Sequence, residues 1–138
     1  MSDEKNAGEA RRWLLTARGD LESARVLNAG GRWAHACFHA HQAAEKALKA
    51  LWYRLDLDPW GHSVRRLLDE LAVGSPETQH ALRDLADAAS ELDQFYIPTR
   101  YPNGLPDLTP EQAFTNAMAD RADALASSIL ERVAGRMG

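Results

Sequence analysis

The chain has 138 residues, 45% of them hydrophobic and 26% charged, which is typical of one soluble globular domain spanning residues 1–138. The formal net charge of −4 argues against a protein that coats nucleic acid by bulk attraction, although a few well-placed cations would suffice to bind phosphate. The single cysteine, Cys37, excludes an intrachain disulfide, and neither a signal peptide nor a membrane-spanning run is visible, so we expect a cytoplasmic protein.

The first predicted helix runs from about Ala10 to Asn28 and follows a polar segment, residues 1–9, that we expect to be loosely ordered. Its apolar positions are spaced by three and four residues, as on one face of a helix. These positions are Leu14, Ala17, Leu21 and Ala24. The glycines of AGG, residues 29–31, favour the left-handed conformation found at helix ends, so we expect the helix to stop there.

The second predicted helix, Arg32 to Leu55, carries two stripes and should be the central helix of the fold. The first stripe is apolar and mostly small, which suits close approach by neighbouring helices. It comprises Trp33, Cys37, Ala40, Ala44, Ala47, Leu51 and Leu55. The second stripe is polar and rich in nitrogen, and comprises His35, His39, Gln42, Lys46, Lys49 and Tyr53. Such a continuous polar face on a central helix is a candidate functional surface.

Start signals predict three more helices. A short one covers Val64–Val73 with Ser63 as its cap, and a longer one begins at Ser75 and continues to about Tyr96. The last begins at Thr109, where Gln112 can complete a capping box. No segment alternates in the manner of a strand, so we predict an all-α fold, an antiparallel up-and-down bundle of four long helices plus one short helix.

The histidines of the second helix could bind a metal ion only with further ligands. His35 and His39 lie one turn apart, and His41 and Glu45 form another such pair, but no third ligand completes either set. Cys37 lies on the apolar stripe, where a thiol usually acts as a small buried hydrophobe. No glycine-rich phosphate loop is present, so we predict neither a metal site nor a cofactor.

The stretch FYIPTRYPN, residues 95–103, is the strongest candidate for binding chemistry. We expect its two prolines to make the chain extended and stiff, so that Arg100 is held ready to grip a planar anion such as phosphate. Tyr96 or Tyr101 could stack on a base. The competing interpretation is structural: Tyr96 covers the core, Tyr101 packs on a neighbour, and Arg100 pairs with a glutamate.

The segments AHACFHAHQAAEKALKALW, GHSVRRLLDEL and LDQFYIPTRYPN, in this order, resemble the HEPN family of small helical domains, and the likeness covers nearly the whole chain. The resemblance implies a four- or five-helix bundle that pairs with a second copy. It also implies nucleotide binding, or a minimal nucleotidyltransferase partner in a toxin–antitoxin-like pair. No membrane role is implied.

Several branches of this family are ribonucleases that cut RNA without a metal, through an arginine followed four to six residues later by a histidine. Arg100 occupies the expected place, but YPNGLPDLTP after it contains no histidine. Arg32 and His39 lie in the second helix, which is the wrong place for the motif. The imidazole is needed for proton transfer, so we expect a module that is not catalytic itself.

These observations lead to one hypothesis and one alternative. In the hypothesis, the proline-containing segment presses Arg100 and a tyrosine against the polar face of the second helix, forming a groove for a nucleotide, an RNA strand or a partner subunit. The rest of this groove would be lined by Gln42, Glu45, Lys46 and Lys49. In the alternative, the chain is a metal-independent ribonuclease with a degenerate motif, whose candidate catalytic residues are Arg100, His39 and His35.

Overall fold

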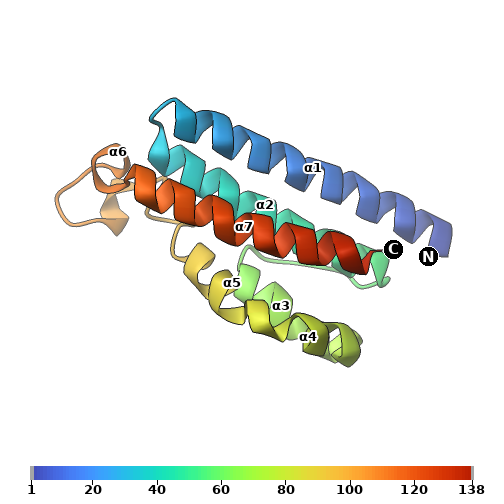
Figure 1. The fold of residues 1–138 in the computed structure, drawn as a ribbon. Helices are drawn as coiled ribbons and strands as arrows, with labels where there is room; N and C mark the ends of the chain where they lie inside the picture. The colour runs from blue at the N-terminus through green and yellow to red at the C-terminus, as the bar shows by residue number, and fades with distance from the viewer. Residues whose placement is uncertain (1, 138) are drawn as a thin grey trace.

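The computed structural model describes residues 2–137, and all regular secondary structure in that range is helical, which confirms the predicted all-α class (Figure 1). The helices are α1 (Asp3–Ala29), α2 (Trp33–Arg54), α3 (Val64–Gly74), α4 (Pro76–Leu82), α5 (Ala86–Asp93), α6 (Pro110–Ala113) and α7 (Asn116–Arg136), with short 3-10 turns at Arg83–Leu85 and Pro102–Gly104. None of the helices in this range has the length and apolar character needed to cross a membrane.

Three long helices, α1, α2 and α7, run beside one another, and the shorter α3, α4 and α5 gather along one side of them (Figure 1). Helix α2 contacts α1, α7, α3 and α5, which confirms its central position. The start of α1 and the end of α7 lie at one end of the molecule, and α6 lies at the other. The segment between α5 and α6 is also at this second end, so the candidate loop projects from the tip of the bundle.

The core of α2 consists largely of small side chains, as its predicted apolar stripe indicated. Ala40, Ala44 and Ala47 are completely buried, as is Cys37. Because alanine adds little bulk, the backbones of neighbouring helices can approach α2 closely. Larger side chains from the other helices, including Leu68, fill the remaining space.

Helix α1 begins earlier than the periodicity predicted. The expectation that residues 1–9 are loosely ordered is wrong for residues 3–9, which form the first turns of this helix. The reason lies in a cap that the apolar pattern did not reveal: Ser2 Oγ accepts a hydrogen bond from the Lys5 N–H at 3.2 Å. Acidic residues in the first turn also suit the helix dipole, and Asn6 is buried.

Most predicted helix boundaries agree with the structure. Gly31 has a φ of +77° in the turn between α1 and α2, Ser63 caps α3, and Thr109 and Gln112 form the predicted capping box. The predicted fourth helix is wrong in its continuity, because a 3-10 turn divides it into α4 and α5, and α5 stops at Asp93. The last long helix likewise has its own cap, Thr115, separate from α6.

Candidate anion-binding site

The segment from Gln94 to Gly104 consists mainly of consecutive turns. The expectation that its prolines make it extended is therefore wrong. The backbone N–H of Arg100 donates to the Ile97 carbonyl at 3.0 Å, and the backbone N–H of Gly104 donates to the Tyr101 carbonyl at 3.3 Å. Each proline occupies the second position of one of these turns, where its fixed φ is favourable. The prolines still stiffen the segment, but they do so by fixing turns.

Arg100 lies at the centre of a cluster of aromatic rings. Its Cζ is 4.4 Å from the ring centroid of Tyr96, 4.8 Å from that of Phe38 on α2, and 5.1 Å from that of Tyr101. Its Nε donates to the Tyr96 carbonyl at 2.9 Å. Cation–π attraction and this hydrogen bond together hold the guanidinium in one place.

The remaining donors of Arg100 are unused within the described part of the chain. A guanidinium carries five N–H groups, and only the Nε–H of Arg100 has an acceptor among residues 2–137. No carboxylate in that range forms an ion pair with it, so the interpretation that Arg100 pairs with a glutamate finds no support in these contacts. Its neighbour Tyr101 is 50% exposed, so an aromatic face lies beside the free donors.

Tyr96 connects Arg100 to a second group of polar residues. On one side its ring stacks on His62, with centroids 5.3 Å apart and an interplanar angle of 18°. It also lies 5.1 Å from the ring of His41 on α2. His62 Nδ1 is 3.4 Å from the carboxylate of Glu45, which is almost completely buried. Through Tyr96, the Arg100 cluster therefore adjoins the pair formed by His62 and Glu45.

Asp93 fixes the position of this second group. Its carboxylate accepts hydrogen bonds from Ser63 Oγ at 2.7 Å and from the N–H groups of Val64 and Arg65 at 2.7 and 3.1 Å. His41 Nε2 lies 3.2 Å from the same carboxylate. Burial disfavours its charged form, but the hydrogen bonds from His41, Ser63 and the backbone outweigh burial, and the pKa of Asp93 is lowered. The carboxylate thereby joins the end of α5 to α2 and to the first turn of α3.

The structure places the other residues predicted for the groove in different positions. Glu45 and Lys49 lie beside His62, with Lys49 Nζ 3.1 Å from the Glu45 carboxylate. Lys46 points to the other side of α2, where its Nζ is 2.7 Å from Asp20 of α1. Gln42 is half-buried and has no hydrogen bond with Arg100. The prediction that Arg100 and Lys46 share a groove is therefore wrong.

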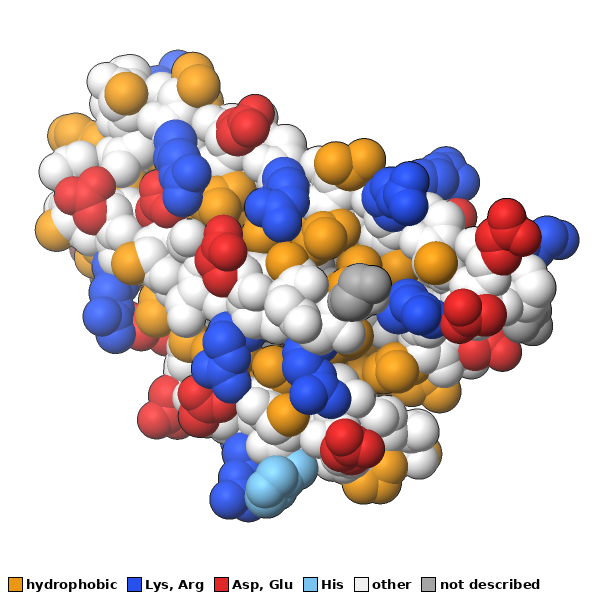
Figure 2. All heavy atoms as spheres, turned by 45° about the vertical axis from the view of Figure 1, so that its right-hand side comes forward, with side chains coloured by type: hydrophobic (Ala, Val, Ile, Leu, Met, Phe, Trp, Pro, Cys, Tyr) orange, Lys and Arg blue, Asp and Glu red, His pale blue; other side chains and the backbone are white. Residues whose placement is uncertain are grey.

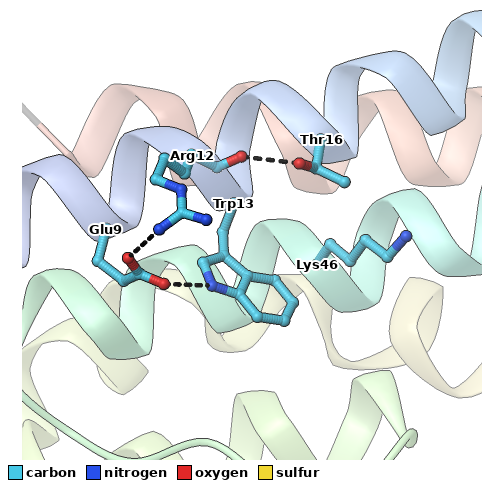
Figure 3. Close-up of a pocket in the computed structure, with 5 residues that line it drawn as sticks. All are labelled: Glu9, Arg12, Trp13, Thr16 and Lys46. Atoms are coloured by element: carbon cyan, nitrogen blue, oxygen red, sulfur yellow. Dashed lines mark hydrogen bonds and ion pairs between the residues drawn. The ribbon is translucent and has the colours of Figure 1, made fainter.

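Lys46 lines a separate open groove between α1 and α2, shown in Figure 3. There Glu9 accepts hydrogen bonds from the guanidinium of Arg12 and from the indole N–H of Trp13, both at 3.1 Å, and Thr16 completes the lining. The charged groups of this groove already have partners. It is consequently a less suitable anion site than the Arg100 cluster.

The candidate histidines His35 and His39 do not join the Arg100 cluster directly. His35 is exposed, whereas His39 lines a shallow groove against α1 and meets the ring of Phe38 edge-on at 5.8 Å. Among residues 2–137, no group of three or more histidine, cysteine or acidic side chains is arranged to hold a metal ion. Burial raises the pKa of the Cys37 thiol to about 12, so this thiol remains protonated at neutral pH.

Sequence reasoning missed His62, Asp93 and Phe38 as parts of the site. His62 directly precedes the α3 cap Ser63, and Asp93 looked like an ordinary acidic residue near a helix end. The only available signal was helical spacing: Phe38, His41 and Glu45 are three and four residues apart and therefore share a face of α2. This is the face that meets the turn segment, and it lies beside the predicted polar stripe.

The surface seen in Figure 2 has no broad field of one charge. Lys and Arg side chains alternate with acidic side chains across the face in view, with apolar patches between them. This mixture agrees with the net charge of −4. Anion binding would therefore depend on a local cluster and not on long-range attraction.

Comparison with known proteins identifies the family. The family model described as the HEPN domain matches residues 10–136. TT1696 from Thermus thermophilus has a crystal structure with a TM-score of 0.83 and 42% sequence identity, and the alignment covers 93% of this chain and 98% of that one. Comparison with curated proteins finds no match.

Two further crystal structures are similar over nearly their whole lengths. ST0689, an archaeal HEPN homologue, gives a TM-score of 0.77 at 33% identity and covers 94% of this chain and 98% of its own. An HEPN domain protein from Thermotoga maritima gives a TM-score of 0.67 at 31% identity, with 91% and 96% of the two chains covered. On the extent of the family match and on these likenesses, the chain belongs to the HEPN domain family.

Proposed function

We propose that this HEPN domain is a binding module that holds the phosphate of a nucleotide or of single-stranded RNA at Arg100. One observation carries the proposal: the guanidinium is fixed by three aromatic rings, while its outer N–H groups have no acceptor among residues 2–137. An arginine that is already immobilised loses little conformational entropy on binding, and its planar fork matches two phosphate oxygens.

The tyrosines beside Arg100 supply the second half of the proposed site. Tyr101 is half-exposed and extends the aromatic surface past the guanidinium, so that a base could stack on it while the adjacent phosphate contacts Arg100. Stacking of this kind tolerates any base, because every base has a π face. We therefore expect weak sequence preference and a clear dependence on salt.

The module would act as a homodimer or with a protein partner. Three large apolar side chains other than Tyr101 are exposed between the end of α5 and the first turn of α7: Ile97, Leu108 and Met118. A second copy covering this surface would place two Arg100 clusters near one another. A minimal nucleotidyltransferase is the other partner that we propose, and a gene for one beside this gene would support that pairing.

The test is equilibrium binding of hexauridylate, measured by calorimetry at moderate salt with the Arg100→Ala and Arg100→Lys variants. We expect Arg100→Ala to weaken binding roughly tenfold or more, since it removes a bidentate, charge-assisted contact. Arg100→Lys should recover only part of the loss, because an ammonium group cannot reproduce the fork. Arg18→Ala, at an exposed position on α1, is the control for general loss of positive charge.

Unchanged binding by Arg100→Ala would exclude the phosphate role of this residue. The RNA should also be recovered intact after long incubation with the wild-type protein. Cleavage that is lost in His35 or His39 variants would instead support the ribonuclease alternative.

A further inference from the structure

His62 occupies a defined position although its side chain is 60% exposed. Gly61 has a φ of +84°, a conformation that lets the chain turn sharply immediately before it. Ser63, immediately after it, caps α3 and is bound to Asp93. The imidazole also stacks on the ring of Tyr96, with an interplanar angle of 18°. Backbone, cap and ring contact together hold this exposed side chain beside the Arg100 cluster.

The contact with Glu45 sets the orientation of the imidazole. A carboxylate can only accept a hydrogen bond, so at 3.4 Å the Nδ1 of His62 must be the donor. In this tautomer Nε2 is the ring nitrogen that carries no hydrogen. Glu45 is 4% exposed, so its carboxylate is held in place and shielded from water beside the imidazole.

Other charged groups around His62 act in both directions. From α2, Lys49 lies against Glu45 and offsets part of its charge. From the turn segment, Tyr96 contacts both His62 and the guanidinium of Arg100. From the end of α5, Asp93 binds the neighbouring Ser63. Further titratable or charged groups nearby are His41, which also contacts Tyr96, and the α3 residues Arg65 and Arg66.

We propose that His62 is a second phosphate-binding group, which acts together with Arg100 when its imidazole is protonated. The two groups contact the same ring: Arg100 Cζ lies 4.4 Å and the His62 centroid 5.3 Å from the centroid of Tyr96. The inference rests on the proposed function of Arg100 and extends it. The ligand class is a phosphodiester with an attached base, held by one permanent cation and one that depends on pH.

The consequence is that binding tightens as the pH falls. Hexauridylate is a suitable probe because its phosphodiesters stay fully ionised across the range, whereas a phosphate monoester gains charge near pH 6 and would mask the effect. We expect the wild-type protein to bind it about three- to tenfold more tightly at pH 5.8 than at pH 8.0.

Variants of His62 separate its charge from its shape. In His62→Gln the affinity should become nearly independent of pH and match the wild-type value at pH 8.0. In His62→Lys the affinity should stay close to that of the wild-type protein at pH 5.8 at both pH values, since the charge of the lysine is permanent. His80→Gln, at an exposed histidine on α4, should retain the full wild-type pH dependence. Circular dichroism confirms that each variant is folded.

The outcomes distinguish the two proposals. If the wild-type protein does not bind at either pH, or if Arg100→Ala binds normally, the proposed function itself is wrong. If Arg100→Ala loses binding while His62→Gln keeps the wild-type ratio between the two pH values, Arg100 holds the phosphate alone and the role of His62 is refuted. Loss of the ratio in His62→Gln, with its retention in His80→Gln, supports the inference.

Discussion

At the scale of single residues, Asp93 combines several structural roles. Its carboxylate is at the end of α5, but its partners belong to α2 and to the first turn of α3. It acts as a helix cap provided from a distant part of the chain. Removing it would leave the buried His41 and two backbone N–H groups without an acceptor, which is costly inside a protein.

We predict that Asp93→Asn lowers the free energy of unfolding by about 2–3 kcal/mol at pH 7. Because the folded-state pKa of Asp93 is lowered, the stability that it contributes is present above its unfolded-state pKa, near 4, and is lost as the pH falls below that value. Urea denaturation at pH 7 and pH 3 should therefore show a difference between the two proteins that shrinks on acidification. Asp58→Asn, at an exposed position, should differ from wild type by less than about 0.5 kcal/mol.

The residue scale also shows where sequence reasoning stops. Arg100, Tyr96 and Tyr101 could be singled out because prolines, an arginine and tyrosines stand together in a short segment. His62 could not, since its link to Glu45 forms only when α3 packs against α2. The predicted place of Lys46 beside Arg100 was wrong, because helical spacing defines a face of α2 but does not reveal that Asp20 of α1 lies opposite Lys46.

At the scale of elements, α2 depends on the small size of its buried residues. Ala44 is completely buried in the central helix, which is contacted by α1 and α7. Adding bulk there would force these helices apart, since a well-packed core has no room for three further carbon atoms.

We predict that Ala44→Leu destabilises the fold by about 1–3 kcal/mol or more, as overpacked core substitutions do. The control is Ala124→Leu, at an exposed position on α7, which should change stability by less than about 0.5 kcal/mol. Thermal unfolding followed by circular dichroism measures both. Equal transition temperatures for the two variants would mean that the helices can separate at no cost, contrary to this account.

Helix identity and most helix ends could be predicted, because caps, glycine and apolar spacing are local signals. Ser63 and the Thr109–Gln112 box behaved as expected for this reason. The break at Arg83–Leu85 could not be predicted, because no proline or glycine marks it in the sequence. The turns after Asp93 could not be predicted either, since a proline is compatible with both extended chain and the second position of a turn. The choice between these two conformations was made by hydrogen bonds, such as that from the Thr99 hydroxyl to the Phe95 carbonyl.

At the scale of the whole molecule, the proposed dimer makes a prediction about the oligomeric state in solution. We expect sedimentation velocity to show a dimer, with the exposed apolar side chains between α5 and α7 at the interface. Leu108→Glu should weaken dimerisation at least tenfold, since a buried unpaired carboxylate is costly. Val73→Glu, on α3, introduces the same charge at a position that is 89% exposed and should have no effect. A monomer at every concentration would contradict the proposed homodimer.

The two ends of the bundle are available for different purposes. The start of α1 and the end of α7 lie together, opposite the tip that carries the turn segment (Figure 1). A protein fused to either end, or a surface to which that end is attached, would sit at the opposite end of the bundle from the turn segment. The domain could therefore be tethered by its ends while the Arg100 cluster stays accessible to the proposed ligand.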